Sequence, residues 1–279
     1  MRVAAVGHVE WIEFACVARM PAAGEIVHSS EVFSAPGGGG AVTAVALARL
    51  AGQRAGFYTA LGDDELGHRA HDELEALGLR MHVAWRDEPQ RRAFVHLDAA
   101  GERTITVIGS RLGPTGDDAL PWGELAQADA VYFTAGDAAA VRAARAAKTL
   151  VASARGLATL TEAGVELDAL LASGSDTGER YLRGQIDPEP RLVIRTAGGA
   201  GGAWQRPGGE DGVYAAAALP GSVQDAYGCG DSFAAGLTFG LGQGLAVETA
   251  LELGARCGAT CLTGRGPYGR QLTAAEITG

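Results

Sequence analysis

The chain has 279 residues, of which 47% are hydrophobic, and its formal charge is −10. This length and composition fit one large domain with a sizeable core. The acidic balance disfavours a general nucleic-acid binder, which carries a basic surface. No apolar run approaches the ~18 residues of a membrane-spanning helix, and the first residues read as a strand rather than as a secretion signal. We therefore expect a cytoplasmic protein with no nucleic-acid and no membrane partner.

Lysine is nearly absent from the chain. Of the 23 basic residues, only Lys148 is a lysine. A phosphate-binding loop of the G-x-x-x-x-G-K type is excluded, because no lysine follows a glycine. Protein-kinase-like machinery with its strand lysine is excluded as well. The four cysteines form no C-x-x-C pair, and the spacing of Cys257 and Cys261 indicates one buried helix face rather than a metal site.

Short apolar runs alternate with helical stretches along most of the chain. The first are residues 2–9, 40–52, 55–62 and a helix that begins after Asp64 and ends at Gly78. The alternation continues through residues 130–136, 138–148, 149–154, 167–173, 191–199 and 231–244. Such a pattern predicts an α/β domain built on a mainly parallel sheet.

Two segments break this alternation. Residues from about Glu10 to Phe33 and from about Gln90 to Ile108 look like strands without intervening helices. The second segment resembles a hairpin with its turn at residues 98–102. We expect these strands to form a small lid sheet over the carboxyl ends of the core strands, where open α/β sheets bind ligands.

The stretch QDAYGCGDSFAAGL, residues 224–237, joins an extended segment to a helix through Gly228, Cys229 and Gly230. Glycine lets a ligand approach the main chain, and a helix N-terminus offers unpaired N–H groups and positive dipole charge. This combination predicts an anion site. Asp231 in this place is either a base beside a reacting hydroxyl or a simple helix cap. The dinucleotide fingerprint G-x-G-x-x-G does not fit, because position 233 is Phe.

Five stretches, taken in order, resemble the ribokinase-like (PfkB) carbohydrate kinases. They are PGGGGAVTAVALARLAG, ALGDDELGHRAHDELEALGL, GERTITVI, IRTAGGAGGAW and DAYGCGDSFAAG. Each is weak alone, but the ordered set covers nearly the whole chain. The resemblance implies a single ribokinase-like domain over residues 1–279, with a three-layer α/β/α core, a mainly parallel central sheet and a small β-strand lid.

The resemblance also implies roles for individual residues. Asp231 would be the base, and Gly228, Cys229 and Gly230 would form the anion hole for the γ-phosphate. The expected ATP-binding residues are Thr196, Gly198, Gly201, Asp176 and Glu179. Glu179 would organise Mg²⁺ through water, with Asp176 where the family has asparagine, and Asp225 matches a monovalent-cation position of some members.

The acceptor side departs further from the family. Gly37 and Gly38 open the glycine motif, but Val42 stands at its sugar-binding asparagine and Ile12 at the aspartate of the first strand. Ser110 and Arg111 replace another asparagine. Because an unpaired hydroxyl costs ~1–3 kcal/mol, we expect an acceptor other than ribose or fructose held in the usual way.

Charged and aromatic residues near these positions are candidates for new contacts. Glu10 shares a strand face with Ile12, and Trp11 with Glu13. Trp11 would stack on a sugar or a base, or else pack in the lid. Arg103 and Arg111 would pair with an acidic or phosphorylated acceptor.

The sequence thus predicts an ATP- and Mg²⁺-dependent kinase that phosphorylates an alcohol group of a small polyhydroxylated acceptor. The alternatives are a nucleoside kinase on the same fold and a non-catalytic nucleotide- or sugar-binding regulator. A homodimer through the lid is a further expectation. Cys229 at a helix N-terminus is either a thiol of lowered pKa or a tolerated small residue.

Overall fold

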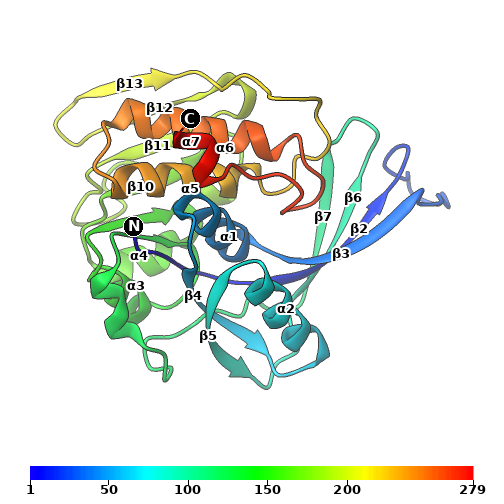
Figure 1. The fold of residues 1–279 in the computed structure, drawn as a ribbon, viewed down its shortest axis with the longest axis horizontal. Coiled ribbons are helices and arrows are strands. Elements are labelled where there is room, and N and C mark those ends of the chain that lie inside the picture. Colours follow the sequence, from blue (N-terminus) through cyan, green and yellow to red (C-terminus); the bar gives the residue numbers. More distant parts are fainter. Residues whose placement is uncertain (279) are drawn as a thin grey trace.

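A large central sheet organises the chain in the computed structural model, which describes residues 1–278 (Figure 1). Its nine strands lie in the order β13-β12-β11-β10-β9-β8-β1-β4-β5. They are β1 (Val3–Val6), β4 (Ala55–Gly62), β5 (Leu79–Arg86), β8 (Ala130–Phe133), β9 (Thr149–Ser153), β10 (Ala169–Ser173), β11 (Val193–Thr196), β12 (Gly202–Gln205) and β13 (Asp211–Tyr214). The strands from β11 to β5 are mutually parallel, and β12 and β13 add an antiparallel edge. The predicted mainly parallel sheet is confirmed.

The strand order reverses at β1. From β1 the chain builds toward β4 and β5 on one side, and β8 returns to pair with β1 on the other side. In open α/β sheets such a reversal leaves a crevice at the carboxyl ends of the two strands, because the crossover helices depart to opposite faces. The fold therefore places its ligand crevice beyond the ends of β1 and β8.

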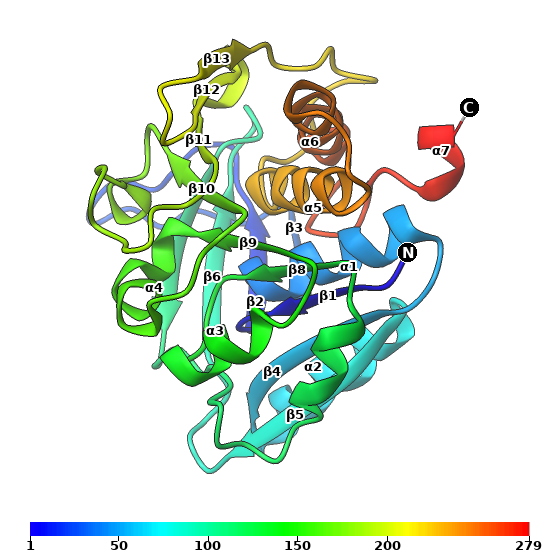
Figure 2. The same cartoon turned by 90° about the vertical axis from the view of Figure 1, so that its left-hand side faces the viewer.

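Helices cover both faces of this sheet and complete a three-layer core (Figure 2). One face carries α1 (Gly39–Ala51), α2 (Glu65–Ala76), α5 (Cys229–Gly242) and α6 (Val247–Cys261), and the other carries α3 (Ala138–Ala144) and α4 (Leu157–Ala163). A short α7 (Ala274–Thr278) and 3₁₀ turns at Trp122–Gln127, Ala154–Gly156, Thr177–Glu179 and Gly198–Ala200 complete the chain. Successive residues of a strand point to opposite faces of the sheet. In β1, Ala5 packs in the core on the α1 face, and Ala4 packs in the core on the α3 face.

The expected helix after Asp64 illustrates how local sequence sets an element. The Asp64 carboxylate accepts a hydrogen bond from the Gly67 N–H at 2.9 Å and caps α2. Ala70 and Leu74, one turn apart, are fully buried. Gly78 follows the helix with φ 95°, a conformation that suits glycine.

The lid is a separate sheet that projects to one side of the core (Figure 1). Its order is β3-β2-β6-β7, from β2 (Glu10–Cys16), β3 (Glu31–Gly37), β6 (Arg92–Leu97) and β7 (Arg103–Ile108). The predicted β6–β7 hairpin is confirmed. The first lid segment extends beyond the predicted end at Phe33, because β3 pairs with β2 as far as Gly37, opposite Glu10.

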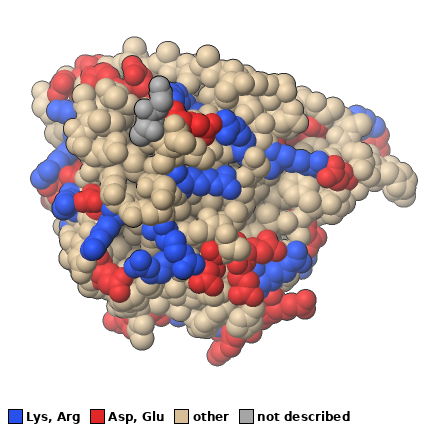
Figure 3. Space-filling model, in the orientation of Figure 1, with Lys and Arg blue, Asp and Glu red and all other residues tan. Residues whose placement is uncertain are grey.

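The surface shows no single-sign field on the face drawn in Figure 3, where basic and acidic side chains are interspersed. Within residues 1–278, no helix is long and apolar enough to span a bilayer.

Candidate active site

The crevice at the strand reversal is built from backbone segments in close contact. His8 follows β1 and Thr134 follows β8, and both are buried. The start of α1 crosses this point so tightly that a Cβ on Gly40 would lie 2.7 Å from the His8 nitrogen. A cavity of about 220 Å³ opens beside Thr134. It is lined by residues 133–136, by Arg155 with the residues that follow it, and by Arg111.

Helix α5 begins at this crevice, as the glycine-cysteine-glycine stretch predicts. Gly228 precedes the helix with φ 81° and ψ 1°, a left-handed conformation that glycine adopts without a Cβ penalty. The first intrahelical bond runs from the Ser232 N–H to the Gly228 carbonyl at 2.8 Å. The N–H groups before Ser232 therefore remain available at the helix start. No atom lies within 4 Å of the Cβ position of Gly230, so the helix start faces open space, where an anion would fit.

Asp231 lies in the first turn of α5 and is half-buried. No hydrogen bond or ion pair from another described residue reaches its carboxylate. Its Oδ1 and the Thr134 Oγ1 lie 3.0 Å and 3.5 Å from the Cβ position of Gly39, which places the carboxylate beside the cavity. Burial raises the pKa of Asp231 to about 6, and Glu179 adds to the rise while Arg103 and Arg155 oppose it. The group is thus ionised at neutral pH, basic for a carboxylate, and unpaired.

Cys229 does not have the lowered thiol pKa that its place at the helix start suggests. A hydrogen bond to Cys261 and burial raise its pKa well above the ordinary value. The dipole effect is outweighed because the thiol lies against Cys261, at the end of α6, rather than facing the anion position. Cys257 and Cys261 are both buried on α6, as predicted.

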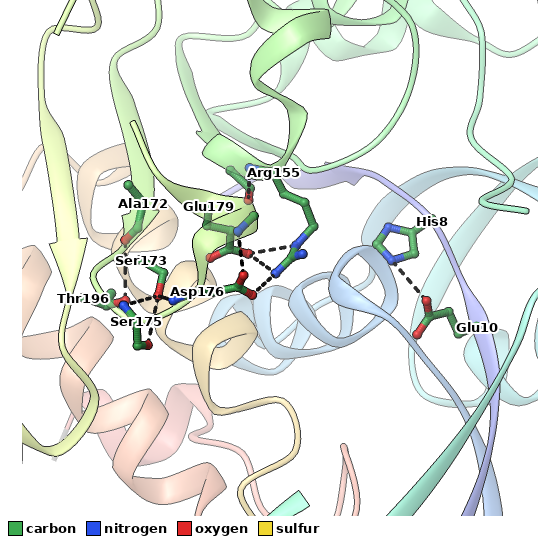
Figure 4. A network of polar contacts seen from close by, with 11 residues as sticks. His8, Glu10, Arg155, Ala172, Ser173, Ser175, Asp176, Glu179 and Thr196 are labelled. Atoms are coloured by element: carbon green, nitrogen blue, oxygen red, sulfur yellow. Dashed lines mark hydrogen bonds and ion pairs between the residues drawn. The ribbon is translucent and has the colours of Figure 1, made fainter. Parts of the chain in front are cut away.

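Asp176 and Glu179 are held together by an arginine that sequence reasoning did not single out (Figure 4). The Arg155 Nη2 lies 2.6 Å from Asp176 Oδ2 and 2.8 Å from Glu179 Oε1. Asp176 also caps its 3₁₀ turn by accepting the Gly178 N–H at 2.8 Å. The hydrogen bonds from Arg155 and Gly178 hold the pKa of Asp176 below its ordinary value. The negative charge of Glu179 acts on Asp231 and contributes to its raised pKa, which places Glu179 in the electrostatic surroundings of that carboxylate.

The remaining predicted nucleotide residues lie at the end of β11. The Thr196 hydroxyl donates a long hydrogen bond of 3.5 Å to the Ala172 carbonyl. Gly198 faces open space, with no atom within 4 Å of its Cβ position. Gly201 is required by close packing instead, because a Cβ there would lie 2.0 Å from the Tyr214 carbonyl oxygen.

Asp225 is buried, and its carboxylate connects two loops through hydrogen bonds. Its carboxylate accepts the Tyr227 N–H at 2.7 Å and the Gly266 N–H at 2.8 Å. Only 1% of the residue is exposed. The residues described contain no group of three or more His, Cys, Asp or Glu side chains arranged to hold a metal ion. A monovalent-cation role for Asp225 stays a prediction.

On the acceptor side, the lid contributes a buried ion pair next to His8. Arg91 Nε lies 2.8 Å from Glu10 Oε1, and the His8 Nε2 lies 3.9 Å from the same oxygen. Burial raises the pKa of Glu10, although Arg91, Arg111 and Arg155 oppose the rise. Burial and the same three arginines lower the pKa of His8 to about 3, so this histidine is neutral. Its Nδ1 is buried and has no hydrogen-bond partner in residues 1–278.

Ile12 and Val42 are fully buried in an apolar cluster with Phe14, Val95 and Tyr227. They present no accessible surface in this structure, and their assignment to the acceptor site stays a prediction. Gly37 and Gly38 lie at the same junction, where the Gly38 N–H donates to the Tyr227 hydroxyl at 2.9 Å.

Trp11 points away from the acceptor side. It is 2% exposed, packs in the main core, and carries the Arg69 guanidinium 4.4 Å from its ring centroid. Of the two roles open to Trp11, packing therefore holds and stacking on a ligand does not, although the packing is in the main core rather than in the lid. The strand alternation that directs Glu10 toward the crevice turns Trp11 toward α2.

Arg103 begins β7 and donates to the Ala226 carbonyl at 2.9 Å, close to the stretch that precedes α5. It is exposed and contributes positive charge near Asp231. Sequence reasoning missed Arg91, Arg155, His8 and Thr134. The sequence did carry one signal for His8 and Thr134. Both lie just after buried core strands, at the strand ends where open α/β sheets bind ligands.

An α/β sheet with a crevice at the strand reversal and a small lid sheet defines the fold class, and comparison with known proteins identifies the family. The sequence profile described as pfkB family carbohydrate kinase matches residues 1–156 and 166–273. The chain therefore belongs to the PfkB family of carbohydrate kinases. A comparison with curated proteins returns no match.

Solved structures of similar fold cover the whole chain. A putative ribokinase from Agrobacterium tumefaciens is 22% identical, with a TM-score of 0.81, 99% of this chain covered and 96% of that one. Arabidopsis thaliana ribokinase, solved with ribose and ATP, is 18% identical at TM-score 0.75, with 99% and 97% covered. Adenosine kinase from Sinorhizobium meliloti is 20% identical at TM-score 0.77, with 99% and 98% covered. At these identities the likeness establishes the ribokinase-like fold.

Proposed function

We propose that the chain transfers the γ-phosphoryl group of ATP to an alcohol group of a small polyhydroxylated acceptor, with Asp231 as the base. The observation that carries the proposal is the Asp231 carboxylate. It is unpaired among residues 1–278, its pKa is raised to about 6, and it lies at an open helix start near Thr134, which lines the cavity. A structural cap would instead be hydrogen-bonded to the helix N–H groups.

The reaction is a direct displacement at phosphorus. The acceptor hydroxyl gives its proton to Asp231, its oxygen forms a bond to the γ-phosphorus, and the bond to the β–γ bridging oxygen breaks to release ADP. The N–H groups at the start of α5 stabilise the charge on the transferring group. The lid strands cover the acceptor and exclude water.

The carboxylates of Asp176 and Glu179 fit a Mg²⁺ ion that is held through water, because they are oxygen donors of the kind this ion prefers. When bound, Mg²⁺ neutralises negative charge on the phosphates. Like-charge repulsion from Glu179 raises the pKa of Asp231, and Arg155 offsets part of this rise. Thr196 and Gly198 are proposed to line the nucleotide, and Gly37, Gly38, Glu10 and Arg103 to contact the acceptor.

The substitution Asp231→Asn tests the proposal. We expect turnover to fall by at least ~10³-fold, since removal of a base and its charge acts directly on the transition state. ATP affinity, measured by calorimetry, should stay within a fewfold. The control is Asp72→Asn on the exposed face of α2, where the side chain is 82% exposed. Unchanged turnover in Asp231→Asn contradicts the proposal, and ATP binding without any turnover in the wild type favours the non-catalytic regulator.

A nucleoside acceptor is less well supported. The adenosine kinase shares the fold, but the aromatic residue expected to stack on a base, Trp11, is buried in the core. Nucleosides therefore belong in the acceptor screen as a comparison arm.

A further inference from the structure

The cavity beside Thr134 is lined by two arginines that differ in their partners. Arg155 is engaged by both Asp176 and Glu179. Arg111 follows the lid strand β7 at the rim of the cavity and is exposed. None of the other residues in 1–278 gives Arg111 a hydrogen bond, an ion pair or a ring contact. An unpaired guanidinium beside a concave space offers a planar set of donors to a ligand.

The protein supplies no carboxylate for Arg111. On the lid side, Glu10 acts on Arg111 through its charge, but its carboxylate is paired with Arg91 at 2.8 Å. Across the cavity, the carboxylates of Asp176 and Glu179 are paired with Arg155. His8 between them is neutral, since its pKa is about 3. Partial desolvation, followed by repulsion from Arg91 and Arg155, lowers the pKa of Arg111. A negative charge in the cavity would relieve this repulsion.

The residues around the acceptor position favour a charged ligand over a neutral sugar. Ile12 and Val42, at the positions where the family grips hydroxyls, are buried and apolar. On the lid face that Ile12 shares, Ile105 and Val107 of β7 pair with Val95 and Ala93 and remain 40% and 45% exposed. This wall cannot hydrogen-bond hydroxyl groups. Arg111, which has no partner among residues 1–278, offers a stronger contact, because a guanidinium and an anion pair strongly.

We propose that the acceptor carries an anionic group, a carboxylate or a phosphate, that docks on Arg111 in this cavity. The cavity reaches Thr134, whose hydroxyl lies beside the same Gly39 position as Asp231. In this arrangement the acceptor extends from Arg111 through the cavity toward Thr134, with its reacting hydroxyl at the end nearer Asp231. This inference rests on the proposed kinase function and specifies its substrate class.

Matched pairs of acceptors test the inference. We propose to assay ADP formation with gluconate against glucose, fructose 6-phosphate and fructose 1-phosphate against fructose, and ribose 5-phosphate against ribose. At least one anionic member should exceed its neutral counterpart by about 100-fold in kcat/KM, the worth of one bidentate charge-assisted contact. Comparing gluconate with the sugar phosphates shows whether the site binds a carboxylate or a phosphate.

The variant Arg111→Gln should raise the acceptor KM, remove most of that preference and leave the ATP KM within about twofold, because the contact is to the acceptor. Arg80→Gln, a surface arginine whose partner Glu124 is 3.7 Å away, is the matched control. A preference for the neutral members, or a preference that survives Arg111→Gln, overturns the inference and leaves the kinase proposal standing. A raised ATP KM instead assigns Arg111 to the nucleotide and also overturns it.

Binding separates the two proposals if no acceptor is phosphorylated. Calorimetric titration with the same pairs, without ATP, should show an anionic compound binding at least about tenfold more tightly than its neutral counterpart, and only in the chain with Arg111 intact. This result supports the inference even when the kinase proposal fails. Equal binding within every pair, or no binding at all, contradicts it.

Discussion

The crevice has two sides, one proposed for phosphoryl transfer and one for the acceptor. They differ in how many of the residues typical of the family each side retains. On the proposed phosphoryl-transfer side, the start of α5 faces open space at Gly230, Asp231 follows it in the first turn, and Arg155 pairs with both Asp176 and Glu179. On the acceptor side, the positions that would grip a sugar are apolar and buried, and arginines lie nearby. The contrast fits the proposal that the chemistry of phosphoryl transfer is retained in this chain while its acceptor differs from the usual sugars.

The physical reason is that the two sides face different constraints. Every phosphoryl transfer develops negative charge on the transferring group and on the oxygens that attack and leave. The N–H groups at the start of α5 and the base must therefore keep their geometry. Acceptors differ in shape and charge, and specificity follows from which groups are left unpaired when the wrong acceptor binds. A change in the lid and the cavity therefore alters the substrate without altering the reaction.

After Asp231→Asn, the substitution Glu179→Gln should give the next largest effect on the phosphoryl-transfer side. It removes one of the two carboxylates held by Arg155 and one proposed Mg²⁺ contact, so we expect kcat to fall by about 100-fold. Steady-state kinetics at saturating Mg²⁺ and ATP measure the change. Glu162→Gln on the exposed face of α4 should leave kcat unaltered. Equal rates in the two variants would remove Glu179 from the site and weaken the contrast between the two sides.

Asp231→Asn should also stabilise the fold, in a pH-dependent way. Asp231 has an ordinary pKa of 3.8 that is raised to about 6 in the folded chain. The folded state therefore holds this proton more tightly, and stability is lost as pH rises from about 4 to about 6. Above that window the buried charge costs on the order of 3 kcal/mol. Urea unfolding should show the variant more stable than the wild type by about this amount at pH 8 and nearly equal at pH 4. A destabilised variant at pH 8 would indicate a structural role for the carboxylate.

Alkylation of Cys229 should have the smallest effect. Because its thiol pKa is raised by Cys261 and by burial, little thiolate is present at neutral pH. We expect iodoacetamide at pH 7 to label Cys16, which is half-buried in the lid, well before Cys229, with activity retained. Mass spectrometry of the labelled peptides beside an activity assay measures this. Rapid labelling of Cys229 with loss of activity, prevented by ATP, would show that the thiol faces the anion position after all.

Much of this molecule could be predicted from its sequence, because the informative signals are local. The glycine-cysteine-glycine joint predicted an open helix start, and Asp64 and Gly78 marked the ends of α2. The hairpin turn predicted the β6–β7 pair of the lid. Each of these depends on neighbouring residues and on backbone geometry, which the order of residue types reports directly.

The rest depended on contacts that local sequence does not report. Strand alternation put Glu10 and Trp11 on opposite faces, but only the packing of α2 decides that Trp11 is the one buried. Arg155 is distant in sequence from Glu179, and Arg91 from Glu10, so these ion pairs carry no local pattern. The raised thiol pKa of Cys229 likewise follows from Cys261, which arrives from another helix.

The pH dependence of kcat/KM tests most directly whether Asp231 is the base. The account predicts that kcat/KM falls with decreasing pH along a limb of unit slope centred near pH 6, the pKa to which Asp231 is raised. Replacing Glu179 by Gln should move this limb to lower pH, because Glu179 contributes to the raised pKa. A profile that stays flat down to pH 5, or a limb that persists unchanged in Asp231→Asn, would contradict the account.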